Sequence, residues 1–198
     1  MNMLKLGSRL LWSGIIAIVS AFAWIFAAVY VNRTFDFYTG ALSQLGSPGA
    51  VDPWIYNDGL IFTSLLLFTF AVSLLIHASN RIESAGSSFL MVAALFLALI
   101  GVYHGGTYPH DFVSVWFFIQ SDIAIITWGI GMLFSDCKWG ISVITLSIVS
   151  TGIGFGVQWP SSAELETFGA AAISLWTVIM TIIMRHRDGM MMNYTSIR

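Results

Sequence analysis

The chain has 198 residues, of which 57% are hydrophobic and only 9% charged, with a formal net charge of −2 at pH 7 and a mean hydropathy of +0.83. A soluble domain carries about 25% charged residues, so this chain has too little polar surface to fold as a water-soluble globule. Its scattered basic residues form no patch that would neutralise phosphates, which argues against a nucleic-acid partner. The single cysteine, Cys137, excludes an internal disulfide.

Six apolar segments predict an all-α, polytopic membrane helix bundle that forms a single membrane domain over residues 1–198. Each is long enough to cross about 30 Å of hydrocarbon as a helix, and helices are required because no water inside the bilayer satisfies an open backbone. The first segment is longer than a signal-peptide core, so we interpret it as a retained helix. The predicted transmembrane helices are Leu10–Val31, Leu60–Ile76, Ser87–Tyr103, Phe112–Phe134, Trp139–Val157 and Phe168–Met184.

The basic residues predict the orientation of these helices. In multi-pass membrane proteins, cytoplasmic loops carry an excess of Lys and Arg. If the N-terminus is cytoplasmic, Arg33 is the only one of the eight basic residues on the outer side of the membrane. The cytoplasmic basic residues are then Lys5, Arg9, Arg81, Lys138, Arg185, Arg187 and Arg198. We therefore expect a cell-membrane protein with both termini cytoplasmic.

The first outer loop, residues 32–59, is much longer than the other connections between helices. Long loops in compact proteins are usually functional or disordered. The aromatic content of this loop argues against a flexible tether, and we expect it to fold over the outer end of the bundle. These aromatic residues are Phe35, Phe37, Tyr38, Trp54 and Tyr56.

Polar residues that are able to carry chemistry gather on the predicted outer face. His110 is a candidate general base because histidine titrates near neutral pH, with Asp111, Asp36 or Asp58 as its carboxylate partner. Ser43 is a candidate nucleophile, although no G-x-S-x-G elbow surrounds it and a serine before a turn is more often a cap. The alternative for the histidine is hydrogen bonding that holds the turn in place.

His104 and His110 are also candidate zinc ligands, because imidazole suits zinc and carboxylates commonly complete such sites. Their H-x5-H spacing is not a standard metal spacing, and Gly105-Gly106 between them leaves the geometry open. Zinc is therefore one of several alternatives for this turn.

Asp122 is the one acidic residue expected near the bilayer centre, about 15 Å into the helix predicted from Phe112 at 1.5 Å per residue. Ionisable residues at that depth are costly and usually functional. Ser114 and Ser121 lie on the same side of the helix, which predicts a polar stripe from the outer mouth to mid-membrane. The alternative is an Asp122 that hydrogen-bonds to a neighbouring helix and holds the two together.

Three stretches carry a resemblance to a known family: F-D-F-Y-T-G-A-L-S-Q-L-G-S, Y-N-D-G-L-I-F and G-V-Y-H-G-G-T-Y-P-H-D-F-V-S-V-W-F-F. Together they resemble the archaeal and bacterial membrane family catalogued as domain of unknown function 998, over nearly the whole chain. The family's features fall here on Leu42, Ser43, Leu45, Gly46, Asn57, Gly101, Pro109, His110 and Ser114. The chain differs at Tyr103-His104, where the family often has Phe-Pro. The resemblance implies six helices and no established activity; a fainter similarity is to the Frag1-type six-helix membrane family.

These observations support three hypotheses about function. The first is a membrane-embedded enzyme that acts at the outer leaflet on a lipid or lipid-linked substrate, with His110 at its centre. The second is a small proton-coupled transporter that uses Asp122. The third is a non-catalytic scaffold or subunit of a membrane complex. The expected partners are the lipid bilayer, a lipid ligand and, in the third case, a second copy of the chain or other membrane proteins.

Overall fold

The computed structural model describes the backbone of residues 3–196 and the side chains of residues 3–189. Arg198, one of the basic residues predicted to be cytoplasmic, lies outside the described residues. The described chain is helical, with no β-strand between residues 3 and 196. Six segments are long and apolar enough to cross a membrane, α1 and α2 together forming the first, which confirms the predicted fold class. The elements are α1 Met3–Leu10, α2 Trp12–Val31, the 3-10 helix η1 Leu42–Gly46, α3 Trp54–His77, α4 Arg81–Val102, α5 His110–Met132, α6 Cys137–Gly156 and α7 Ser162–Ser196.

All six spans begin earlier than hydrophobicity predicts, and three of them begin six residues earlier, at Trp54, Arg81 and Ser162 rather than at Leu60, Ser87 and Phe168. Their first turns lie at the ends of the bundle, and at the starts of α4 and α7 a side chain caps free backbone N–H groups. Asn80 accepts hydrogen bonds from the backbone N–H groups of Ile82 and Glu83 at the start of α4. The first loop is consequently shorter than expected and spans residues 32–53.

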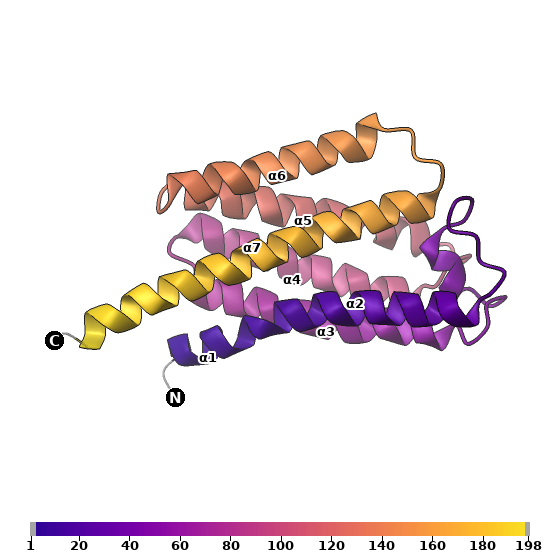
Figure 1. The fold of residues 1–198 in the computed structure, drawn as a ribbon, viewed down its shortest axis with the longest axis horizontal. Coiled ribbons are helices and arrows are strands. Elements are labelled where there is room, and N and C mark those ends of the chain that lie inside the picture. Colours follow the sequence, from indigo (N-terminus) through magenta and orange to yellow (C-terminus); the bar gives the residue numbers. More distant parts are fainter. Residues whose placement is uncertain (1–2, 197–198) are drawn as a thin grey trace.

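The helices run alternately up and down, so the bundle has two distinct ends. The loop end carries residues 32–53, 103–109 and 157–161, and the terminal end carries the start of α1, the α3–α4 and α5–α6 connections and the last turns of α7 (Figure 1). α4 packs along both α3 and α5, α2 lies on α3, and α6 lies on α5. α7 closes the bundle by crossing between α2 and α6, and contacts α5 much less.

Large side chains fill the terminal half of the bundle. Trp128, Trp176 and Phe70 are fully buried, and the rings of Phe70 and Trp176 meet edge to face. The Trp128 Nε1–H donates to Ser87 Oγ at 3.2 Å, which satisfies a donor that would otherwise be buried without a partner. This half is therefore densely packed, in contrast to the half nearer the loop end.

Aromatic and arginine side chains pair at two levels on the outside of the bundle. Arg33 lies over the Tyr30 ring at the loop end, and Arg185 lies over the Trp12 ring at the terminal end. Trp12 and Tyr30 are separated by about 27 Å along α2 at 1.5 Å per residue, close to the thickness of about 30 Å of a bilayer's hydrocarbon core. Aromatic belts at such levels are typical of membrane proteins.

Two buried ionic clusters fasten α7 at the terminal end. In the first, His77 Nε2 lies 3.1 Å from Asp188 Oδ1, and Ser8 Oγ donates to Asp188 Oδ2. Ser73 Oγ also donates to the carbonyl oxygen of Gly7 at 2.8 Å. This cluster ties α7 to α1 and α3.

The second cluster surrounds Glu83, whose side chain has no exposed surface. Its carboxylate accepts hydrogen bonds from the Ser79 N–H at 2.6 Å and from Ser135 Oγ at 3.2 Å. Arg187 on α7 forms an ion pair with it at 3.4 Å and also donates to Ser135 Oγ at 2.9 Å. This cluster ties α7 to the α3–α4 and α5–α6 connections.

Candidate functional site

The first loop is closed at its base and held against α7. Asn32 clamps the two ends of the loop together: its Oδ1 accepts from the Val51 N–H at 2.7 Å, and its Nδ2 donates to the Val51 carbonyl at 3.1 Å. Farther along, the Ala163 N–H donates to the Gly40 carbonyl at 3.0 Å. The Leu42 N–H donates to the Glu166 carboxylate at 2.8 Å. The loop therefore lies over this end of the bundle as an ordered cover.

The residues that carried the family resemblance interlock beneath this cover. Asn57 Nδ2 donates to the Gly46 carbonyl at 2.9 Å. A Cβ at Gly46 would lie 2.1 Å from Asn57 Oδ1, and one at Gly101 would lie 2.4 Å from the Asn57 carbonyl oxygen. A Cβ at Gly105 would lie 2.5 Å from the Ser43 carbonyl oxygen. The L-S-Q-L-G segment thus docks onto α3 and the α4–α5 turn through close backbone contacts that only glycine allows.

Below η1 is an elongated cavity of about 110 Å³ enclosed by α2, α3, α4, α5 and α7. Its lining runs from Ser43 and His110 at the loop end down to Gly14, Leu67 and Thr177. The span from Glu166 to Thr177 corresponds to about 16 Å along α7, or roughly half of the hydrocarbon thickness of about 30 Å. The cavity is therefore about 16 Å long along α7, and its deepest lining residue on α2, Gly14, lies only two positions from Trp12.

The polar groups of the cavity are concentrated at its loop end, and several of them have no protein partner. Ser43, Tyr56, His110, Ser114 and Glu166 all line it there. Among the described residues, no hydrogen bond is made by the hydroxyls of Ser43 and Tyr56, and only one oxygen of Glu166 is engaged, by the Leu42 N–H. The deeper lining is dominated by aliphatic and aromatic side chains, and among the side chains of residues 3–189 no Lys or Arg lines the cavity.

His110 and Ser114 form an ordered pair one helical turn apart on α5. His110 is buried, and its Nδ1 lies 2.7 Å from the Tyr103 carbonyl oxygen. A carbonyl oxygen only accepts hydrogen bonds, so Nδ1 carries the hydrogen and Nε2 of the neutral ring has a free lone pair. Ser114 Oγ lies 3.4 Å from that Nε2.

A second, apolar hollow of about 270 Å³ adjoins the cavity. It lies between α2 and α7 under Phe35 and Phe37, and its lining shares Phe22, Ile25, Leu42 and Ala170 with the cavity. Since α2 and α7 meet at few positions, the two hollows make this the loosely packed side of the bundle.

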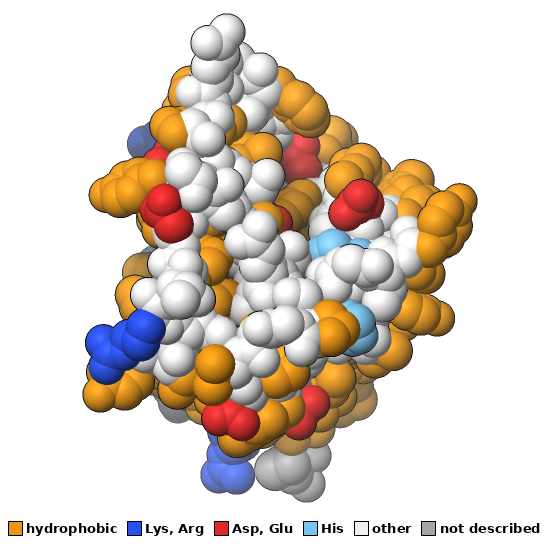
Figure 2. All heavy atoms as spheres, turned by 90° about the vertical axis from the view of Figure 1, so that its right-hand side faces the viewer, with side chains coloured by type: hydrophobic (Ala, Val, Ile, Leu, Met, Phe, Trp, Pro, Cys, Tyr) orange, Lys and Arg blue, Asp and Glu red, His pale blue; other side chains and the backbone are white. Residues whose placement is uncertain are grey.

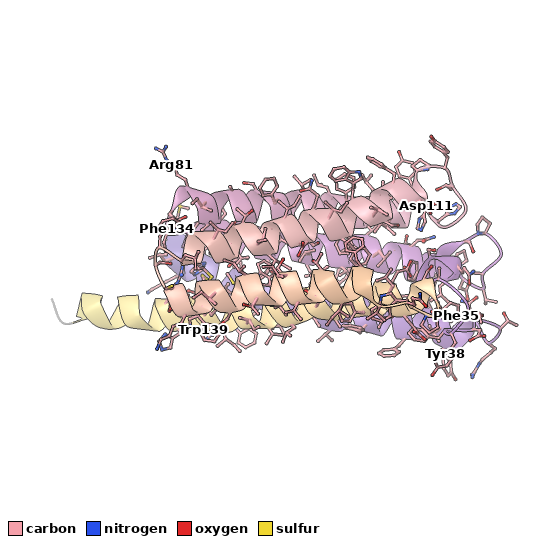
Figure 3. The ribbon with its side chains drawn as sticks, turned by 90° about the horizontal axis from the view of Figure 1, so that it is seen from above. Phe35, Tyr38, Arg81, Asp111, Phe134 and Trp139 are labelled. Atoms are coloured by element: carbon pink, nitrogen blue, oxygen red, sulfur yellow. The ribbon has the colours of Figure 1, made fainter. Side chains whose placement is uncertain are left out.

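The three candidate carboxylate partners lie outside the cavity, on the exposed surface of the loop end. Asp36 accepts from the Tyr38 N–H and from Thr39 Oγ1, both at 2.9 Å, within its own turn. Asp58 and Asp111 are exposed near the starts of α3 and α5. In Figure 3, Asp111 lies at the rim, well apart from Phe35 and Tyr38. Figure 2 looks onto this end, where acidic and histidine side chains surround a hollow.

The two candidate zinc ligands, His104 and His110, have no third ligand beside them among the described residues. Within the described part of the chain, no group of three or more His, Cys, Asp or Glu side chains is able to hold a metal. His104 Nδ1 lies 3.1 Å from the Gly105 carbonyl, and His110 Nδ1 is engaged by Tyr103. The donor set therefore does not fit the four-ligand pattern of zinc sites.

Asp122 lies at the middle of α5, where it accepts a hydrogen bond from Ser147 Oγ of α6. It does not line the cavity. Of the two serines predicted to share its stripe, Ser114 lines the cavity, whereas Ser121 is buried and donates to the Phe117 carbonyl at 2.8 Å. The geometry is that of an inter-helix hydrogen bond, which is the alternative considered for this residue.

Two residues at the loop end of the cavity, Tyr56 and Glu166, are not among the site residues predicted from the sequence. A signal for Glu166 exists: Ser161 and Glu164 have the S-x-x-E spacing of a capping box, and Ser161 Oγ accepts from the Glu164 N–H at 3.1 Å. A capping box at Ser161 predicts that α7 begins before Phe168, and therefore that Glu166 lies on the helix instead of in a loop. Tyr56 carries no comparable signal, because its position in the cavity depends on α3 beginning at Trp54.

Comparison with known proteins gives one match. A family model described as protein of unknown function (DUF998) matches residues 15–183, a range that includes η1, the α4–α5 turn and most of the cavity lining. No curated protein and no solved structure matches this chain.

Proposed function

The chain belongs to the family of proteins of unknown function (DUF998), and on that premise we propose that it binds a lipid with one chain inserted in the cavity. The polar head of this lipid lies among His110, Ser43, Tyr56 and Glu166 at the loop end. The protein resides in the cell membrane with both termini cytoplasmic, so the head faces the outer leaflet.

One observation carries this proposal: an elongated, largely apolar cavity ends beneath η1 in polar groups that lack a hydrogen-bond partner among the described residues. Ligand sites are typically apolar with a few convergent polar groups, and buried polar groups in proteins normally have partners. A head group supplies the missing partners of Ser43 and Tyr56, while its chain fills the space between α2 and α7.

The charges around the cavity favour a neutral or cationic head over a phosphate. Anionic heads are usually held by Lys or Arg, and neither residue type lines the cavity in the part of the chain whose side chains are described. Glu166 instead presents a carboxyl oxygen that suits a hydroxyl or ammonium donor. Transport through Asp122 is less well supported, because Asp122 bonds to Ser147 and lies outside the cavity lining.

We expect the purified protein to retain a lipid that Ala170→Phe excludes. Ala170 borders both hollows, and a phenyl ring there occupies the space of the chain. Native mass spectrometry of the detergent-solubilised protein is expected to show a bound mass in the wild type and the loss of most of it in Ala170→Phe. Ala171→Phe is the matched control, since Ala171 is exposed on the same helix. Equal occupancy in all three proteins, or none in the wild type, contradicts the proposal.

The orientation is testable with the single cysteine. Cys137 is exposed at the terminal end, so a membrane-impermeant maleimide added to intact cells is expected to leave it unmodified until the membrane is permeabilised. In a Cys137→Ser background, Ser47→Cys in the first loop is expected to react with intact cells. Reaction of Cys137 in intact cells reverses the assignment of the two ends.

A further inference from the structure

We propose that the site is catalytic, with Ser114 as the nucleophile and His110 as the general base in hydrolysis of an ester bond of the bound lipid. This inference rests on the lipid-binding function proposed above and adds to it a reaction and a substrate class: an ester of a neutral alcohol.

The orientation of His110 is the first support. Its Nδ1–H is held by the Tyr103 carbonyl at 2.7 Å, so Nε2 is left as a proton acceptor facing Ser114 Oγ at 3.4 Å. In serine hydrolases the base is likewise oriented by an acceptor on its far nitrogen. Here a backbone carbonyl takes the place of the carboxylate, and the nucleophile–base distance is in the looser range seen without substrate.

The environment of the Ser114 hydroxyl is the second support. Hydroxyls on helices commonly donate to the carbonyl four residues earlier, as Ser121, Ser174 and Thr177 do here. Ser114 makes no such bond within the described chain, and its hydrogen bond is to the imidazole. Its hydroxyl is therefore committed to the base instead of to its own helix.

The depth of the pair is the third support. Ser114 lies about 6 Å below the start of α5 at 1.5 Å per residue, under the head-group level and above the apolar lining. An ester that joins a polar head to an acyl chain lies at this boundary. The unpartnered hydroxyls of Ser43 and Tyr56 line the same cavity and are donors for the oxygen that becomes negative in the reaction.

The reaction consumes one ester and one water. Ser114 Oγ attacks the ester carbonyl carbon as its proton passes to His110 Nε2, and the carbonyl electron pair moves onto oxygen. When the carbonyl re-forms, the bond to the alkoxide breaks, and the alkoxide leaves as the alcohol with the proton from Nε2. Water then attacks acyl-Ser114 and gives a proton to Nε2, which returns it to Ser114 Oγ as the carboxylic acid leaves.

The test is covalent labelling with a fluorophosphonate that carries a long alkyl chain, a probe for serine nucleophiles activated by a base. The detergent-solubilised wild type is expected to form an adduct that peptide mass spectrometry locates at Ser114. Ser114→Ala is expected to abolish the adduct. His110→Gln is expected to lower the labelling rate at least tenfold, because general-base catalysis contributes about 10²- to 10⁴-fold. Ser121→Ala, on the same helix and outside the cavity, is the control expected to label normally.

Lipid retention by native mass spectrometry on the same samples separates the two proposals. If the wild type retains lipid but shows no adduct at Ser114, the catalytic inference is overturned and lipid binding is not. The same conclusion follows if the wild type retains lipid and His110→Gln is labelled as fast as the wild type. A wild type that neither retains lipid nor reacts overturns both. Turnover of a fluorogenic long-chain ester, lost in Ser114→Ala while lipid is retained, is the supporting result.

Discussion

Replacing Arg187 with alanine is expected to lower the free energy of unfolding by about 3 kcal/mol, the lower part of the range for breaking a buried ion pair. The cost comes from the carboxylate left behind: Glu83 is fully buried, and Arg187 is its cationic partner at 3.4 Å. Ser79 and Ser135 continue to donate hydrogen bonds to it, but they supply no positive charge. The measurement is the unfolding midpoint of the detergent-solubilised protein with increasing SDS or temperature.

Two companion variants identify the cause. If the unpaired charge is responsible, Glu83→Gln in the Arg187→Ala background recovers most of the lost stability, because the amide keeps acceptor and donor groups without a charge. Arg185→Ala removes a nearby exposed arginine that stacks on Trp12 and is expected to cost at most about 1 kcal/mol. Equal losses in Arg185→Ala and Arg187→Ala, or no rescue by Glu83→Gln, contradict this account.

Gly101→Ala is expected to destabilise the protein by about 1–3 kcal/mol, the range for overpacking a close contact, and to weaken lipid retention as well. The new methyl group would lie 2.4 Å from the carbonyl oxygen of Asn57. That oxygen belongs to the backbone of α3, so no side-chain rotation relieves the contact and α3 and α4 must separate. Because Asn57 also holds Gly46 of η1, the separation displaces the cover that carries Ser43. Unfolding midpoint and lipid occupancy are both to be measured.

Gly152→Ala on α6 is the matched control, since nothing lies within 4 Å of a Cβ at that helical position. A helical Gly→Ala change without a clash stabilises by about 1 kcal/mol. Opposite signs for the two variants are therefore expected. If Gly101→Ala is as stable as the wild type and retains as much lipid, the close contact between Gly101 and Asn57 does not limit the residue at position 101.

Local sequence signals account for the spans and for part of the site. Hydrophobic length alone predicts six membrane-spanning helices, because the bilayer imposes a minimum apolar length on each. His110 and Ser114 are four residues apart, and a helix places such residues on one face. The sequence therefore predicts that the two side chains lie close together, provided that a helix begins at or before His110.

Helix ends and burial were less predictable. Hydrophobicity predicts that α3 begins at Leu60, because Asn57, Asp58 and Gly59 interrupt the apolar run, whereas the helix begins at Trp54. The acids at positions 36, 58 and 111 looked like partners of His110 in the sequence, yet they are exposed and a backbone carbonyl holds the ring.

Composition and hydrophobic length alone predict the class of this protein and its six spans, and the sequence shows that most basic residues fall at one end of the bundle. The structure adds contacts between distant segments: Glu166 and Tyr56 join His110 around one cavity, Asp122 bonds to Ser147, and Arg187 forms an ion pair with Glu83. Composition and periodicity depend only on which face of its own helix a residue occupies and on whether that helix is apolar enough for the bilayer. A cavity or a buried ion pair depends on contacts between helices far apart in the chain, which no local pattern encodes.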